Sequence, residues 1–219
     1  MILTIQFCTA HSQNYNFSFS QNRATYSALG IDVPSYKENW TLKRKFLSIG
    51  FHFQYQGQAY DSLEILPMGE ICFDATARTT VMLIKGLMQK ADTNGTISFL
   101  RFQTSGNTGQ RVFKLEYIGA GVSPMPAETI EVQLWLYEQN GAIELHYGPN
   151  SYANAKDSTT TLLIGPINWQ MNTPQNGFLL TGNPQNNSVT GVHITSVTDL
   201  KYMVRIPDNG TVFTLIPSN

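Results

Sequence analysis

The chain has 219 residues, a formal net charge of −1 at pH 7, and only 13% charged residues. This near-neutral balance gives no basic field of the kind that attracts nucleic acid or acidic membrane surfaces. Aromatic residues make up 11% of the chain, which argues against intrinsic disorder because disordered chains are poor in aromatic residues. Composition therefore predicts a folded protein that does not bind nucleic acid.

The first twelve residues are a short apolar run followed by small residues, which resembles the end of a secretory signal peptide. We expect residues 1–12 to be the remnant of such a signal, with cleavage near Ser12 and Gln13. A short strand over residues 2–7 is the alternative. Residues 13–219 are then expected to form a single domain. The signal remnant leads us to expect an extracytoplasmic protein. No stretch approaches the ~18 consecutive apolar residues of a membrane span, so we expect no transmembrane segment.

Cys8 and Cys72 are the only cysteines, and they do not make a disulfide framework. No His or Cys spacing matches a zinc site, and neither an acidic calcium loop nor a phosphate-binding loop occurs. Cys72 lies in a strand-like run, where buried packing is its expected role. We therefore expect neither a metal nor a cofactor.

Apolar and polar residues alternate along most of the chain, which is the pattern of half-buried strands separated by turns such as Asn-Gly. About a dozen such segments predict an all-β, antiparallel β-sandwich of jelly-roll-like form. Residues 79–91 differ, and they form either one short helix or an irregular strand; Gly86 weakens the helix. The predicted strands include residues 14–20, 51–56, 97–102, 112–117, 160–164, 177–181, 192–197, 202–206 and 212–216.

Residues 130–147 give the clearest hairpin. Asn140-Gly141 predicts a two-residue type I′ turn, which places Leu136 opposite Leu145 on the core face. If residues 112–117 form the neighbouring strand, Lys114 and Glu116 join the opposite face. That opposite face carries Gln133, with Trp135 facing His146 and Tyr137 facing Glu144.

Aromatic rings beside hydrogen-bonding side chains can stack sugars and orient their hydroxyl groups, so Trp135, Tyr137, Glu144 and His146 are candidate ligand-binding residues. The favoured alternative is that the second sheet or a loop covers this face, because large aromatic side chains are mostly buried. Trp40 and Trp169 lie in loop-like polar surroundings and are better candidates for exposed contact residues. Their favoured alternative is a cap over the edge of the sandwich.

Catalytic signatures are missing from the sequence, including the nucleophile elbow of hydrolases. Glu70 and Asp74 could share one face of a strand, as the carboxylates of a glycoside hydrolase do, but a pair at a strand end near a turn is the simpler interpretation. Glu131, Glu138 and Glu144 are interpreted as solvated strand residues. We therefore predict that the protein is not an enzyme.

Six segments follow one another along the chain: IGFHFQY at 49–55, LPMGEICF at 66–73, RVFKLEY at 111–117, EVQLWLYE at 131–138, IELHYGP at 143–149 and PDNGTVF at 207–213. In this order they resemble a domain of secreted and surface proteins of Bacteroidetes. The resemblance covers roughly residues 14–217 and implies an all-β, extracytoplasmic domain of the kind often followed by a type IX secretion sorting domain. It implies no catalytic residues.

The resembled group uses a short Asp-Ser/Thr-apolar pattern for O-glycosylation, and this makes Ser62 and Ser158 candidate glycosylation sites. Together these observations predict a non-enzymatic binding, adhesion or interaction module of a secreted or surface protein. Its expected partners are other surface or secreted proteins, or glycans. The alternative is a carbohydrate-binding module or the domain of a polysaccharide-active enzyme.

Overall fold

The computed structural model describes residues 16–37, 40, 42–74, 79–84, 86–88, 98–122, 125–152, 162–170 and 173–218. These residues form fifteen strands and three short 3₁₀ helices, and the described part of the chain contains no α-helix. The predicted all-β class is confirmed, with more strands than expected. Where residues 79–91 are described, they form two short strands, Thr79–Met82 and Leu87–Met88, with a bend at 83–84, which agrees with an irregular strand rather than a helix. Cys8, Ser158 and the predicted signal remnant lie outside the described residues.

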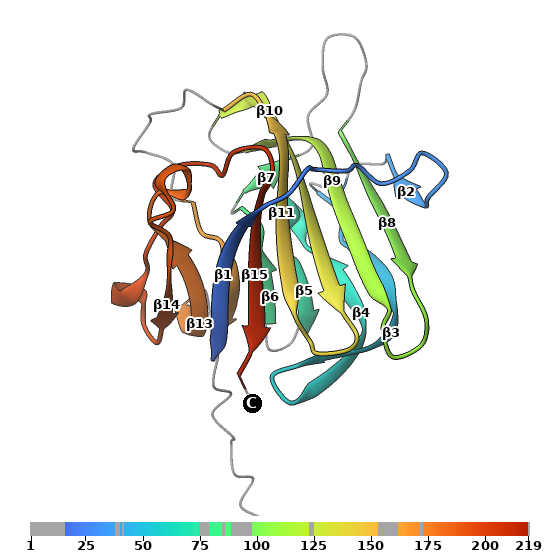
Figure 1. Cartoon of the computed structure of the whole chain (residues 1–219), viewed down its shortest axis with the longest axis horizontal. Helices are drawn as coiled ribbons and strands as arrows, with labels where there is room; N and C mark the ends of the chain where they lie inside the picture. Colours follow the sequence, from blue (N-terminus) through green and yellow to red (C-terminus); the bar gives the residue numbers. More distant parts are fainter. Residues whose placement is uncertain are drawn as a thin grey trace, which may run out of the picture.

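Two antiparallel sheets make up the fold (Figure 1). The first has the order β1 (Phe17–Arg23), β15 (Thr211–Pro217), β11 (Ile143–Asn150), β10 (Met125–Tyr137), β9 (Val112–Val122), β8 (Phe99–Ser105) and β2 (Ser35–Tyr36), with β7 (Leu87–Met88) also paired to β9. The second has the order β14 (Thr190–Ile194), β13 (Thr173–Thr181), β12 (Gly165–Gln170), β6 (Thr79–Met82), β5 (Ile71–Asp74), β4 (Gln58–Ile65) and β3 (Lys45–Tyr55). The 3₁₀ helices are η1 (Pro67–Gly69), η2 (Pro184–Asn186) and η3 (Val197–Asp199).

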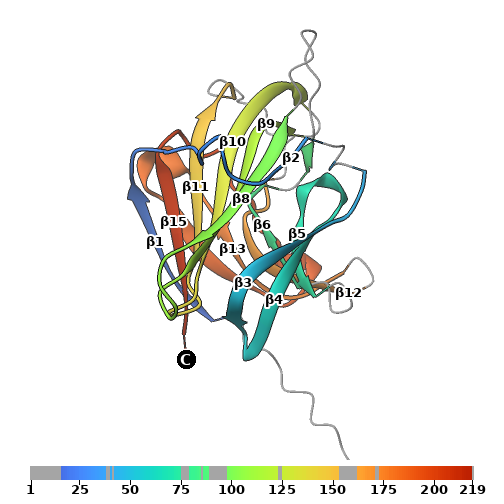
Figure 2. The same ribbon diagram turned by 90° about the vertical axis from the view of Figure 1, so that its right-hand side faces the viewer.

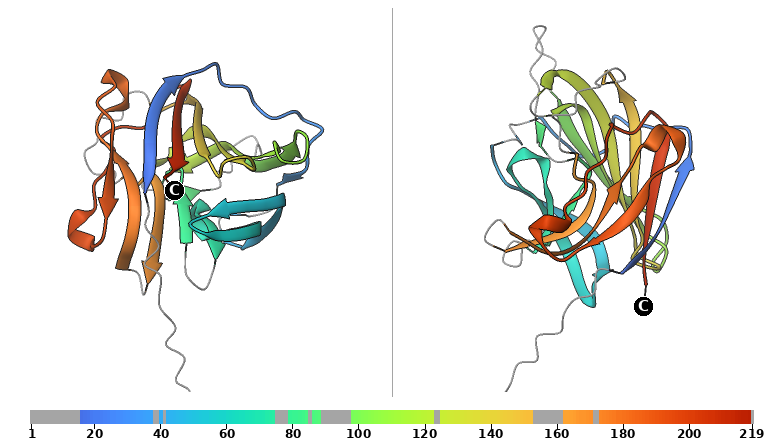
Figure 3. Two further views of the ribbon diagram at one scale, coloured as in Figure 1. Left: turned by 60° about the horizontal axis from the view of Figure 1, so that its bottom comes forward. Right: turned by 90° about the vertical axis from the view of Figure 1, so that its left-hand side faces the viewer.

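The two sheets form separate layers that face each other, as Figures 2 and 3 show from three further directions. Alternate side chains of each strand point between the layers and form one large apolar core. Phe53 of the second sheet and Tyr117, Tyr147 and Phe213 of the first are fully buried there. The predicted β-sandwich is therefore confirmed.

The β10–β11 hairpin keeps its predicted core face but not its predicted register. Leu134 pairs with Leu145 and Leu136 with Ile143, a shift of two residues from the expected pairing. Because strand side chains alternate with a period of two, this shift leaves every residue on its predicted face. These four side chains are all buried in the core.

The shift arises because the loop has four residues, 138–141, rather than two. The amide of Tyr137 donates to the carbonyl of Ala142 at 3.0 Å and closes the loop. The amide of Glu138 donates to the carbonyl of Arg111, the residue before β9, at 2.9 Å. Asn140 Oδ1 accepts from the amide of Ala142 at 3.0 Å. The Asn140 side chain therefore fixes a longer turn than the Asn-Gly pair alone predicts.

Residues 24–34, here called the strap, connect β1 to β2 by crossing the outer face of the first sheet in front of β11, β10 and β9 (Figure 1). At one end the amide of Ala24 donates to Gly210 O at 2.9 Å. At the other end the amide of Phe102 donates to Pro34 O at 3.1 Å. A loop therefore does cover part of the face that carries the predicted site.

Candidate functional site

The four side chains predicted to share the outer face of the hairpin do meet there. The rings of Trp135 and His146 stack with their centroids 4.1 Å apart. Tyr137 donates its hydroxyl to Glu144 Oε2 at 2.7 Å, and His146 Nε2 lies 2.8 Å from the same oxygen. Together with Lys114 of β9, which pairs with Trp135, we call these residues the outer-face cluster.

Both faces of the Trp135 indole are covered. Lys114 Nζ lies 3.5 Å from the centroid of the ring, while the His146 ring stacks 4.1 Å away. Two groups this close to one ring cannot occupy the same face, so they lie on opposite faces. The Lys114 ammonium gains a cation–π interaction from this placement. Trp135 therefore offers no free face on which a sugar ring could stack.

Glu144 is held as an anion by its neighbours. Its side chain is only 20% exposed, so the interpretation of Glu144 as a solvated residue was wrong. Burial by itself would raise the pKa of this carboxyl, but hydrogen bonds from His146 and Tyr137 lower it below its ordinary value. Thr214 of β15 donates to the other carboxylate oxygen at 3.2 Å. Both oxygens of Glu144 therefore already accept hydrogen bonds from the protein.

The same interactions shift the pKa of two other residues in the cluster. Burial raises the pKa of Tyr137, and the neighbouring Glu144 raises it further. Burial also lowers the pKa of Lys114, and the charge of Glu144 partly offsets this decrease. The cluster is thus a connected set of charged and aromatic groups rather than a row of independent surface residues.

Glu116 lies under the strap and is fully buried. It accepts hydrogen bonds from the Tyr26 hydroxyl at 2.6 Å, the amide of Leu29 at 3.0 Å and Gln133 Nε2 at 2.7 Å. Gln133 Oε1 in turn accepts from Trp135 Nε1 at 2.7 Å. One hydrogen-bonded network therefore runs from the strap to the outer-face cluster.

Two further glutamates, Glu131 of β10 and Glu138 of the hairpin loop, are partly exposed. Burial and the charge of Glu116 raise the pKa of Glu131, while Arg101 lowers it. Arg111 binds the Glu138 carboxylate with Nε 2.9 Å from Oε2, and this contact lowers the pKa of Glu138 to about 2. Neither glutamate is therefore the freely solvated strand residue that the sequence suggested.

A family model described as NIDO-related matches residues 14–217. The chain belongs to the NIDO-related family. This membership indicates an extracellular type of module, and none of the described residues forms a helix long and apolar enough to cross a membrane. No curated protein and no solved structure matches the chain.

The NIDO-related domain places its other two tryptophans away from this cluster. Trp40 is 0% exposed and stacks edge-to-face on Tyr117 with the ring centroids 5.3 Å apart. Its Nε1 donates to Ser98 O at 3.3 Å. Trp40 is therefore wrong as a candidate for an exposed contact residue, whereas the favoured alternative, a ring packed against the sandwich, agrees with its burial.

Trp169 lies half-buried on β12, against a small second apolar cluster of Met82, Leu163, Ile167, Leu179 and Ile194. Its buried Nε1 has no hydrogen-bond partner among the described residues. The side chain is therefore only partly available as a contact residue.

Glu70 and Asp74, the two carboxylates that could have shared one face of a strand, lie at the ends of β5. Glu70 precedes β5, and Asp74 is the last residue of that strand. The pairing of β5 with β6 shifts in register between Cys72 and Asp74. Both carboxylates therefore lie at strand ends, as the simpler interpretation has it.

Ser62, the candidate glycosylation residue of the NIDO-related domain, is exposed on β4 opposite Ser48. Its modification stays a prediction. Within the described ranges, no group of three or more His, Cys, Asp or Glu side chains is arranged to hold a metal ion.

Sequence reasoning missed Tyr26 and Gln133. The strap shows no hydrophobic periodicity, so nothing in its sequence predicts that Tyr26 reaches Glu116 across the sheet. Gln133 was on the predicted outer face. Its place there, next to Trp135 on the same strand and opposite Glu116 on β9, is the signal that could have shown that it links the two side chains.

Proposed function

We propose that this NIDO-related domain is a non-enzymatic interaction module of a secreted or cell-surface protein. The observation that carries the proposal is the hydrogen bonding of its outer-face carboxylates. Glu116 and Glu144 both accept from groups of the protein itself. Family membership supports the extracellular part of the proposal.

A catalytic carboxylate must reach a proton of the substrate, directly or through one water. The oxygens of Glu144 are instead directed to Tyr137, His146 and Thr214. Among the described residues, His146 is hydrogen-bonded to Glu144 and to no Ser, Thr or Cys side chain, as a base would be to its nucleophile. This arrangement supports a structural role for the Glu144–His146 pair.

The partners proposed for the domain are other secreted or surface proteins, or glycans. The resemblance of the ordered motifs to a domain of secreted and surface proteins of Bacteroidetes supports an adhesive role, and we propose export by type IX secretion on the same resemblance. The alternative is a polysaccharide-active enzyme or its carbohydrate-binding module. Hydrolysis and binding are separable by experiment.

The test is an assay for new reducing ends on a panel of polysaccharides, run beside binding assays on arrays of glycans and purified surface proteins. We expect saturable binding of the domain to at least one glycan or surface protein, and no release of reducing ends above the rate in buffer. Release that disappears in Glu144→Gln, or in Glu70→Gln with Asp74→Asn, would contradict the proposal if the melting temperature of the variant matches that of the wild type.

A further inference from the structure

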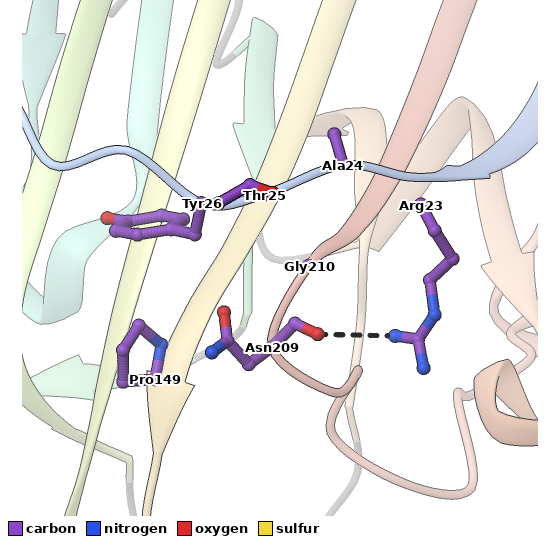
Figure 4. A pocket seen from close by; sticks show the side chains of 7 residues that line it. All are labelled: Arg23, Ala24, Thr25, Tyr26, Pro149, Asn209 and Gly210. Atoms are coloured by element: carbon purple, nitrogen blue, oxygen red, sulfur yellow. Dashed lines mark hydrogen bonds between the residues drawn. The ribbon is translucent and has the colours of Figure 1, made fainter.

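A hollow of about 600 Å³ opens beside the strap, on the side toward β15 (Figure 4). It is lined by residues 23–26, where β1 passes into the strap, by Pro149 of β11, and by Asn209 and Gly210 of the loop before β15. These segments are far apart in the sequence and meet only in the folded sheet. The volume lies within the range of about 300–1,000 Å³ that is usual for small-molecule sites.

The backbone around the hollow is fixed by hydrogen bonds. The amide of Gly210 donates to Tyr147 O at 2.8 Å, and the amide of Ala24 donates to Gly210 O at 2.9 Å. The amide of Thr211 donates to Asp208 O at 3.0 Å and tightens the same loop. Binding a ligand would therefore cost little conformational entropy, because the backbone that lines the hollow is already ordered.

Tyr26 lines the hollow with an aromatic ring whose position is fixed. A Cβ placed on Gly148 would lie 2.7 Å from Tyr26 Cζ and 2.8 Å from both Cε atoms, so the ring lies face-on against this glycine. The hydroxyl is anchored to Glu116 at 2.6 Å. In Figure 4, Tyr26 and Pro149 lie at one end of the hollow and Arg23 at the other, with Asn209 between them. The hollow thus offers aromatic and prolyl C–H surface beside polar groups.

The positive charge of Arg23 is already compensated. Its guanidinium donates to Thr211 Oγ1 at 2.8 Å and to Asn209 O at 3.3 Å, and it lies 3.7 Å from Asp208 Oδ2. The lining itself contains no acidic side chain. A ligand would therefore meet no uncompensated charge here, which favours a neutral molecule.

Two exposed polar side chains remain available in the hollow. Among the described residues, neither the Asn209 amide nor the Thr25 hydroxyl has a hydrogen-bond partner in the protein, and both line the hollow. An amide both donates and accepts, and so does a hydroxyl group. This pairing suits the hydroxyl groups of a sugar, whose C–H faces pack on aromatic rings.

We propose that this hollow binds a neutral saccharide. The inference rests on the proposed function, because it names one class of partner for the module. It uses none of the outer-face cluster, where Trp135 has no free ring face.

The experiment is saturation-transfer NMR on the full chain with cellobiose, lactose, mannobiose and chitobiose, with oligogalacturonate as the charged probe. A positive neutral probe is then titrated into ¹⁵N-labelled protein. We expect amide shifts at Thr25, Tyr26 and Gly210. Asn209→Ala should weaken binding about tenfold, the cost of losing a good hydrogen-bonding partner, while Asn107→Ala in the β8–β9 turn should bind like the wild type.

Three results would overturn the inference: no neutral probe binds, only oligogalacturonate binds, or a neutral probe binds equally well to the wild type and Asn209→Ala. Mapping on the wild type decides the site even if Asn209→Ala fails to fold, since shifts confined to other residues also contradict it. None of these results bears on the proposed function, which is tested separately by the reducing-end assay and by binding to purified surface proteins.

Discussion

Glu138 illustrates how one side chain can set local structure. Its carboxylate accepts from the side chain of Arg111 and from the amides of Gly109 and Arg111. Arg111 also donates from Nη1 to Gly50 O of the opposite sheet at 2.7 Å. Glu138 therefore joins the hairpin loop to β9 and, through Arg111, to β3.

This arrangement predicts a pH dependence of stability. The pKa of Glu138 is lowered from 4.5 to about 2, so the folded protein keeps the carboxylate ionised where the unfolded chain takes up a proton. The stabilisation is fully present above about pH 4.5 and is lost as the pH falls toward 2. We expect the melting temperature of the wild type to fall more steeply between pH 5 and pH 2 than that of Glu138→Gln.

Thermal melts across this pH range give the comparison, with the exposed Asp32→Asn as control. Equal slopes for the wild type and Glu138→Gln would show that Arg111 does not hold the carboxylate as described. At neutral pH the Glu138→Gln variant should also melt below the wild type, because Arg111 loses its charged partner.

Among the elements, the position of the strap depends on Gly148 of β11, which lies beneath it. Gly148 has no positive φ, so an alanine would cause no backbone strain there. Its Cβ would nevertheless lie 2.7 Å from the Tyr26 ring and force the strap outward. Gly148→Ala should therefore weaken the Tyr26–Glu116 hydrogen bond and cost about 1–3 kcal/mol of stability.

Hydrogen exchange at the Leu29 amide, which donates to Glu116 at 3.0 Å, reports directly on this movement. We expect faster exchange in Gly148→Ala than in the wild type. Gly30→Ala is the matched control, since it lies on the strap with nothing within 4 Å of its Cβ. Unchanged exchange at Leu29 in Gly148→Ala would mean that the strap does not rest on this position.

Among the secondary-structure elements, some features could be predicted from the sequence and others could not. Alternation predicts most strands and their faces well, because it follows directly from the geometry of the backbone. It was wrong for residues 202–206, where only Met203 forms isolated bridges. The hairpin register was missed since Asn-Gly does not reveal that the Glu138 amide pairs with Arg111. Trp40 was misplaced because its sequence neighbours are polar, while its burial depends on the packing of Tyr117 from a distant strand.

For the whole molecule, the sandwich follows from the number and patterning of the strands. The candidate sites follow from the topology. Pairing of β9, β10 and β11 creates the outer-face cluster, most of which the hairpin pattern predicted. The hollow instead combines residues 23–26 with Pro149 and Asn209, and no local pattern links segments so far apart.

The central claim is that this NIDO-related domain works outside the cytoplasm as a binding module. Protease treatment of intact cells of the native host, followed by mass spectrometry of the released peptides and of the culture medium, tests it most directly. We predict peptides from residues 14–217 in these two fractions, with a mature N-terminus near Gln13. Recovery of the protein only from the cytosol of lysed cells, with Met1 intact, would contradict the claim.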